Sequence, residues 1–203
     1  IGFMTLFSPD KTPKHAILAL LAALLFAFSP ALFADYEDGI NAAFEGNYAT
    51  AFREFSLAAE EGLDLAQFNL AILYFTGRGV EKDEALAFKW TLAAAEQGHT
   101  DAQFNLASLY SEGDGTKKDM DKAVEWFTYA ARAGHPLSAF ILASMYKDGD
   151  HVSRDAVQAH AWASLAISNE NADAIGLREE LEDDMSPTQL SQARRLFARW
   201  QLE

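Results

Sequence analysis

A stretch of seventeen residues occurs three times in this chain, at intervals of 36 residues. Residues 58–74 read AAEEGLDLAQFNLAILY, residues 94–110 read AAEQGHTDAQFNLASLY, and twelve of these seventeen positions are identical. A third copy, AARAGHPLSAFILASMY, follows at residues 130–146 without a gap. Self-similarity at a fixed period of about 20–50 residues is the signature of repeat architectures. The chain should therefore consist of stacked copies of one small unit.

The spacing of residues within each period predicts two helices per repeat. Recurring positions follow i, i+4, i+8 in the first helix and i, i+3, i+7 in the second, so each set lies on one helix face. A glycine follows the first helix, where a left-handed residue is favoured, and an aspartate precedes the second, where it can cap free N–H groups. The recurring positions are Ala66/Ala102/Ser138, Leu70/Leu106/Leu142, Tyr74/Tyr110/Tyr146, Gly77/Gly113/Gly149, Asp83/Asp119/Asp155, Ala87/Ala123/Ala159, Trp90/Trp126/Trp162 and Ala94/Ala130/Ala166.

A single helix pair of this kind leaves an apolar face uncovered, so its neighbours must stack on it. We therefore predict an all-α fold, an α/α solenoid of antiparallel helix pairs with a C-terminal capping helix. The expected units are an N-terminal capping pair at 35–65, repeats at 66–101, 102–137 and 138–173, and a C-terminal cap at 174–203. In this cap, residues 186–189 read as a capping box with proline at the first helical position. The final helix then carries one apolar stripe that should seal the stack: Leu190, Ala193, Phe197 and Trp200.

The first 34 residues have the layout of a secretory signal peptide. Two lysines precede an uninterrupted apolar run at 16–28, a Ser-Pro pair ends the run, and cleavage is expected after Ala34 or, alternatively, after Ala31. We expect an exported protein, periplasmic or secreted, whose mature chain has no membrane contact. The alternative is an uncleaved membrane anchor, although the run is shorter than the ~20 residues that a span requires.

Charge and cysteine content exclude several classes of function. The formal net charge is -14, whereas binding to nucleic acid or to an anionic membrane surface requires clustered lysine and arginine. The chain contains no cysteine, which removes thiol nucleophiles, a lipid attachment site and disulfides. An exported chain of this kind must be stabilised by packing alone.

The recurring positions resemble the Sel1-like repeat, a relative of the tetratricopeptide repeat. The matching pattern is Ala66, Leu70-Ala71, Tyr74, Gly77-x-Gly79-Val80, Asp83, Ala87, Trp90 and Ala94–His99. His151 replaces the second glycine in the third copy, so a loop of different shape is expected at 149–152. The resemblance implies an adaptor that binds a protein or peptide partner along a curved surface, often in bacterial envelope or signalling complexes. A cysteine-rich subgroup has been associated with β-lactam binding or hydrolysis, and a periplasmic enzyme acting on β-lactam or cell-wall material is the alternative.

No constellation in the sequence indicates catalysis, a cofactor or a metal site. His99 and His135 are 36 residues apart, and on adjacent turns two imidazoles could begin a metal site. Each follows a glycine in a short turn, however, and the equivalent positions are Leu63 and Asn171, so we interpret both histidines as turn residues. The glycine-rich loops lack the preceding strand and the GKS/T ending of a phosphate loop. We predict a non-enzymatic protein.

A second stripe on the first helix of each repeat is the candidate partner surface. By resemblance to tetratricopeptide repeats, this helix lines a concave groove, and its asparagine often hydrogen-bonds the backbone of a bound peptide. The phenylalanine of the stripe suits either the groove or the packing between repeats. Four residues after the phenylalanine, the three copies have Ile72, Ser108 and Ser144, and this change from apolar to polar favours a ligand-facing surface at that position. The candidate partner-binding residues are Phe68, Asn69, Ile72, Phe75, Phe104, Asn105, Ser108, Phe140 and Ser144.

Overall fold

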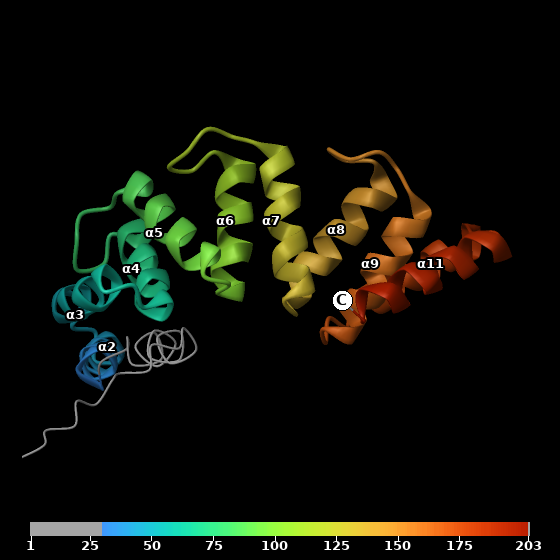
Figure 1. Ribbon diagram of the computed structural model, residues 1–203. Coiled ribbons are helices and arrows are strands. Elements are labelled where there is room, and N and C mark those ends of the chain that lie inside the picture. Colours follow the sequence, from blue (N-terminus) through green and yellow to red (C-terminus); the bar gives the residue numbers. More distant parts are fainter. Residues whose placement is uncertain (1–29, 203) are drawn as a thin grey trace, which may run out of the picture.

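The structure, a computed structural model, describes residues 30–202 as ten α-helices without a strand in that range. From α2 to α9 the helices follow one another in chain order along an arch (Figure 1), and each of them packs against the next, whereas α10 and α11 both pack against α9. The predicted all-α solenoid is confirmed. The helices are α2 (Pro30–Phe44), α3 (Tyr48–Glu60), α4 (Asp64–Thr76), α5 (Glu84–Glu96), α6 (Thr100–Glu112), α7 (Met120–Arg132), α8 (Pro136–Asp148), α9 (Ala156–Ser168), α10 (Ala174–Asp184) and α11 (Pro187–Trp200).

Residues 1–29 of the expected signal peptide lie outside the described residues. Both expected cleavage sites fall in the first turns of α2. Phe33 is 44% exposed, whereas Tyr36, which lies beyond both sites, packs its ring against Phe55 with 5.7 Å between ring centroids. None of the helices in the described part of the chain has the length and apolarity needed to cross a membrane.

The predicted helix caps recur in every repeat. Each aspartate before a second helix accepts a hydrogen bond from the backbone N–H three residues later, which satisfies a donor that the helix leaves unpaired. The glycine after each first helix has a left-handed φ of 67°, 85° or 76°, a conformation that costs glycine little. The aspartates are Asp83, Asp119 and Asp155, and the glycines are Gly77, Gly113 and Gly149.

Alanines at the recurring positions allow neighbouring helices to approach closely. They are buried almost completely, and because their side chain is a single methyl group, the adjacent helix can pack close to the backbone. Larger leucine and aromatic side chains fill the remaining space. The buried core consequently runs along the stack rather than lying at one centre. The alanines are Ala66, Ala102, Ala87, Ala123, Ala159, Ala94, Ala130 and Ala166.

Helix α11 covers the C-terminal end of the stack, as predicted. Ser186 and Gln189 form the expected capping box, and Pro187 is in the first turn. The ring centroid of Trp200 lies 4.2 Å from that of Trp162, which belongs to α9 and is 4% exposed. The last tryptophan of the repeat series is thus buried by the cap instead of by a further repeat.

The loop that joins the two helices of a repeat touches the preceding helix pair with its backbone. A Cβ atom at Gly79 would lie 2.1 Å from the carbonyl oxygen of Tyr48, and one at Gly115 would lie 1.9 Å from that of Glu84. Both glycines have left-handed φ values, 72° and 67°. His151 at the equivalent position keeps a φ of 60°, so the expected difference in loop shape does not extend to this dihedral angle.

Replacing Gly115 by alanine should destabilise the fold more than replacing Gly98. Both residues have a positive φ, so both variants carry a backbone strain of about 1–2 kcal/mol. Only the Cβ at Gly115 meets backbone atoms, whereas Gly98 has no atom within 4 Å. We expect Gly115→Ala to lose a further 1–3 kcal/mol or so of unfolding free energy in urea, because the loop must shift. Equal losses in the two variants would show that the loop is not packed on the preceding pair.

Candidate partner-binding groove

A groove of about 270 Å³ lies between α4 and α6, the first helices of two consecutive repeats. Its floor is formed by buried residues of α4, α5 and α6, of which Thr91 uses its hydroxyl to bond the Ala87 carbonyl. The volume is slightly smaller than that of most small-molecule sites, about 300–1,000 Å³. A space of this size suits one or two side chains of a protein partner. The floor residues are Ala71, Ala87, Thr91 and Leu109.

The two walls of the groove differ in chemistry. Helix α4 contributes Ile72 and Phe75, which are 36% and 41% exposed although both are large and apolar. Helix α6 contributes the polar wall, with Asn105, Ser108 and Glu112, and Asp114 follows in the loop after this helix. The groove therefore offers apolar surface on one side and hydrogen-bonding and charged groups on the other.

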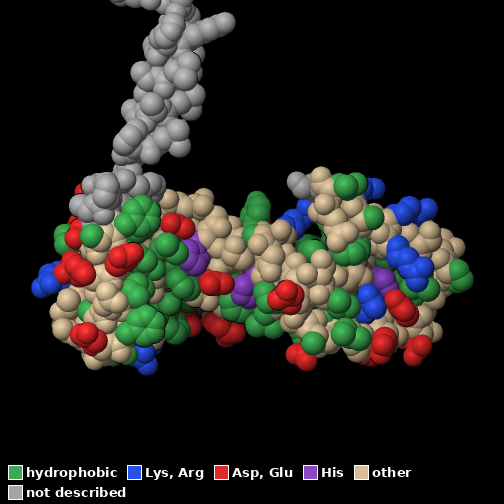
Figure 2. All heavy atoms as spheres, turned by 90° about the horizontal axis from the view of Figure 1, so that it is seen from below, with side chains coloured by type: hydrophobic (Ala, Val, Ile, Leu, Met, Phe, Trp, Pro, Cys, Tyr) green, Lys and Arg blue, Asp and Glu red, His purple; other side chains and the backbone are tan. Residues whose placement is uncertain are grey.

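A second hollow, of about 290 Å³, adjoins the groove at Ile72, which lines both. It lies between α2, α3 and α4, and its rim includes Tyr48, Asn69 and Phe44, the last of which is 88% exposed. On the face shown in Figure 2, hydrophobic side chains gather over the N-terminal half, whereas lysine and arginine side chains gather over the C-terminal end. On this face, hydrophobic side chains available to a partner thus lie mainly over the N-terminal half.

Four of the predicted partner-binding residues line the groove together: Ile72, Phe75, Asn105 and Ser108. Within residues 30–202 the Asn105 side chain has no hydrogen-bond partner. The equivalent Asn69 lines the second hollow, and its amide donates to the Tyr36 hydroxyl at 3.3 Å and to the Leu65 carbonyl at 2.8 Å. Of the two asparagines, Asn105 is the one whose amide is available to a partner.

The phenylalanine column packs between repeats and does not line the groove. The ring of Phe68 on α4 stacks on His99, the residue before α6, with centroids 4.4 Å apart, and that of Phe104 on α6 stacks on His135, the residue before α8, at 4.3 Å. Phe140 is half-buried against the core, and its carbonyl accepts a hydrogen bond from the Ser144 hydroxyl at 3.1 Å. These contacts favour the packing alternative for this column.

The two recurring histidines cap α6 and α8, a role that their sequence context did not reveal. Nδ1 of His99 accepts a hydrogen bond from the N–H of Ala102 at 3.2 Å, and Nδ1 of His135 accepts one from that of Ser138 at 3.2 Å. Asn171, at the equivalent position of the next unit, accepts from a backbone N–H in the same way. No group of three or more histidine, aspartate or glutamate side chains among the described residues is placed to hold a metal.

Ser138, His135 and Asp101 resemble a Ser-His-Asp triad but lack access to a substrate. The Ser138 hydroxyl is 2.9 Å from Nδ1 of His135, and Nε2 of His135 is 4.0 Å from Asp101. Ser138 is completely buried, so its hydroxyl cannot attack a bound molecule. Burial lowers the pKa of His135 and Asp101 opposes this shift. The neutral imidazole that results is the form that can accept the capping hydrogen bond.

Comparison with known proteins gives a consistent family and fold. The profile of the Sel1 repeat matches residues 64–99, 100–135 and 136–171. A solved structure of a protective antigen present in uropathogenic Escherichia coli strains, described as displaying an SLR fold, is 32% identical with a TM-score of 0.71 and aligns with 83% of this chain. A Sel1 repeat protein from Oxalobacter formigenes is 30% identical with a TM-score of 0.64 and aligns with 68% of the chain. The chain spans 38% and 57% of the lengths of these two proteins. Among curated protein sequences there is no significant match.

Replacing His135 should remove a pH-dependent part of the stability. Because the pKa of His135 is lowered from 6.5 in the folded state, the unfolded chain binds this proton more readily. The contribution of neutral His135 to the unfolding free energy is therefore fully present above about pH 6.5. It is lost as the pH falls from there toward the folded-state pKa. His135→Asn should flatten the pH dependence of the unfolding free energy in this range, since asparagine can keep the cap without titrating.

His135→Ala provides the matched comparison, because it removes the cap as well as the titrating group. We expect it to lose about 1–2 kcal/mol at pH 8 from the missing cap and the missing stack on Phe104. His135→Asn should lose less at the same pH. Parallel stability curves for the wild-type protein and His135→Asn between about pH 5 and 7 would contradict the assignment.

Proposed function

Because the chain belongs to the Sel1 repeat family, whose members are generally protein-interaction modules, we propose that it is a non-catalytic adaptor that binds a protein or peptide in the groove between α4 and α6. One observation carries this proposal. Two large apolar side chains, Ile72 and Phe75, remain exposed along a groove with a buried floor. On the other wall, Asn105 has no hydrogen-bond partner within residues 30–202. The groove thus combines both kinds of group that an extended peptide requires.

The groove can supply the usual energetic terms of peptide recognition. An apolar side chain seated against Ile72 and Phe75 would gain about 1.5–3 kcal/mol from the surface removed from water. The Asn105 amide can donate to a peptide carbonyl and accept from a peptide N–H, each for about 0.5–1.5 kcal/mol. The second hollow, which shares Ile72, would extend the contact toward α2.

We also propose that the protein acts outside the cytoplasm, in the periplasm or as a secreted protein of the bacterial envelope. The support is the charged and apolar pattern of residues 1–34. Loss of the residues before Asp35 is compatible with the fold, because Tyr36, which packs on Phe55 and bonds Asn69, lies beyond both expected cleavage sites.

A photo-crosslinker at position 75 should capture the partner, and one at position 129 should not. Phe75 lines the groove, whereas Tyr129 on α7 is exposed to a similar extent, 49%, and lies outside it. We expect Phe75→p-benzoylphenylalanine to give a discrete adduct in an envelope extract, identified by mass spectrometry. Ile72→Asp and Asn105→Ala should each reduce recovery of that adduct at least about fivefold, from a loss of about 1 kcal/mol or more.

Thermal unfolding of the same variants supplies the control, because a lost adduct is informative only if the solenoid is intact. Ile72 and Asn105 are both partly exposed, so these substitutions should change the melting temperature little. Recovery of one protein equally well from positions 75 and 129, or unchanged recovery with both groove variants, would refute the groove as the binding surface.

The mature protein should begin at Asp35, or at Leu32 if the alternative site is used. Expression of the full chain in a bacterial host, fractionation and N-terminal sequencing measure this directly. Replacing both Ala31 and Ala34 by arginine should leave the precursor uncleaved, because signal peptidase requires small residues before the scissile bond. A full-length protein in the cytoplasmic fraction would contradict the export proposal and would leave the groove proposal unaffected.

A further inference from the structure

We propose that the groove between α4 and α6 selects a partner segment in which a lysine or arginine side chain lies next to an apolar one. This inference rests on the proposed function and specifies the chemistry of its partner. It is carried by Glu112 and Asp114, two carboxylates on the polar wall of the groove whose other wall is Ile72 and Phe75. A side chain that crosses the groove from the apolar wall therefore ends at negative charge.

The two carboxylates are not neutralised by the chain itself. Within residues 30–202 the side-chain carboxylates of Glu112 and Asp114 form no ion pair and accept no hydrogen bond. Lys82, a cation that interacts electrostatically with Asp114, has its Nζ 2.7 Å from a carboxylate oxygen of Glu84. Asp114 acts on Lys82 only as a weaker, longer-range attraction. The polar wall thus keeps two carboxylates available to a cationic group.

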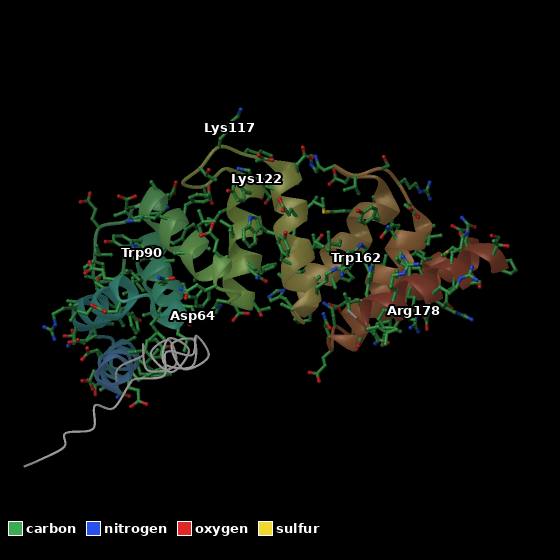
Figure 3. All side chains as sticks on the ribbon, in the orientation of Figure 1. Asp64, Trp90, Lys117, Lys122, Trp162 and Arg178 are labelled. Atoms are coloured by element: carbon green, nitrogen blue, oxygen red, sulfur yellow. The ribbon has the colours of Figure 1, made fainter. Side chains whose placement is uncertain are left out.

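Lys117 and Lys122, which follow Asp114 in the chain, have different surroundings. Lys117, in the loop that contains Asp114, projects away from the helices (Figure 3). The Nζ of Lys122 lies 5.0 Å above the ring of Tyr110. The net charge of the whole chain, -14, adds a general attraction for a basic segment and a repulsion for an acidic one. Charge complementarity therefore favours a cationic partner both locally and at long range.

Lysine and arginine match both walls because each combines an apolar stem with a charged end. The stem would lie along Ile72 and Phe75, and the charged end would reach Glu112 and Asp114. The Phe75 ring already has a cation near its face, since Nζ of Lys82 lies 5.5 Å from the ring centroid. Such contacts between a cation and an aromatic face are favourable. A purely apolar side chain would leave the carboxylates without a partner.

A displayed library of random dodecapeptides provides the test. The library is selected on the wild-type chain and counter-selected on the Ile72→Ser/Phe75→Ser variant, which removes the apolar wall without changing the charge, so that only groove-dependent peptides are kept. We expect these peptides to share a lysine or arginine beside an apolar residue. The best of them, labelled with fluorescein, is then titrated by anisotropy against purified variants.

Glu112→Gln/Asp114→Asn should weaken binding of the selected peptide about three- to tenfold, because it removes the attraction but retains the shape of the groove. The matched control is Glu179→Gln/Asp183→Asn on α10, which changes the net charge equally but lies in another part of the stack. It should leave the affinity almost unchanged. Replacing the peptide lysine by norleucine should weaken binding to the wild-type chain by a similar factor. The same replacement should hardly change binding to Glu112→Gln/Asp114→Asn, because the peptide change and the groove change remove the same interaction.

The outcomes separate this inference from the proposed function. Groove-dependent peptides that lack a cationic residue would overturn the selectivity proposed here and leave the groove as a binding surface. Equal weakening by the α10 control would show that the overall charge is responsible and would also overturn it. Absence of any groove-dependent peptide would count against both proposals.

Discussion

Each helix pair of this protein has an apolar face that only the next pair can cover, and the rest of the structure follows from this constraint. The fully buried alanines at the recurring positions allow that contact, because a helix can approach another closely only where side chains are small. Gly79 and Gly115 extend the same contact to the loops, where backbone meets backbone. At the C-terminal end no further repeat is available, and Trp200 of α11 covers Trp162 instead.

The features that the sequence predicts correctly are those determined by residues close together in the chain. An aspartate caps a helix through an N–H three residues away, and a glycine ends a helix through its own φ, so both can be predicted from one copy of the repeat. The caps made by His99 and His135 were missed for a related reason. Histidine is an uncommon N-cap, and its second contact, a phenylalanine ring, comes from the first helix of the helix pair that precedes it.

The apolar wall of the groove and Asn105 were also predictable, because equivalent positions of adjacent repeats lie side by side in a solenoid. The acidic wall was not. Glu112 is at the last position of α6 and Asp114 is in the loop beyond it, and their position opposite Phe75 depends on the offset between two repeats. Asn69 has the position in its repeat that Asn105 has in the next, so the sequence predicts the same role for both. In the structure, however, the Asn69 amide donates a hydrogen bond to the hydroxyl of Tyr36 on the N-terminal helix. What a recurring residue does thus depends on its neighbours in space.

The same dependence explains why the groove is confined to the N-terminal half of the stack. In the third repeat the position of Phe75 is occupied by Lys147, whose Nζ lies 2.6 Å from a carboxylate oxygen of Glu180 on α10. Ser144, at the position of Ile72, directs its hydroxyl to the carbonyl of Phe140. In α8, therefore, the residue at the position of Phe75 is polar and pairs with the C-terminal cap, and the residue at the position of Ile72 is a serine rather than an apolar side chain. A solenoid of three repeats must use some of its repeated surface to end the stack, and this chain uses the surface of the last repeat, so its first two repeats retain the surface that a partner can reach.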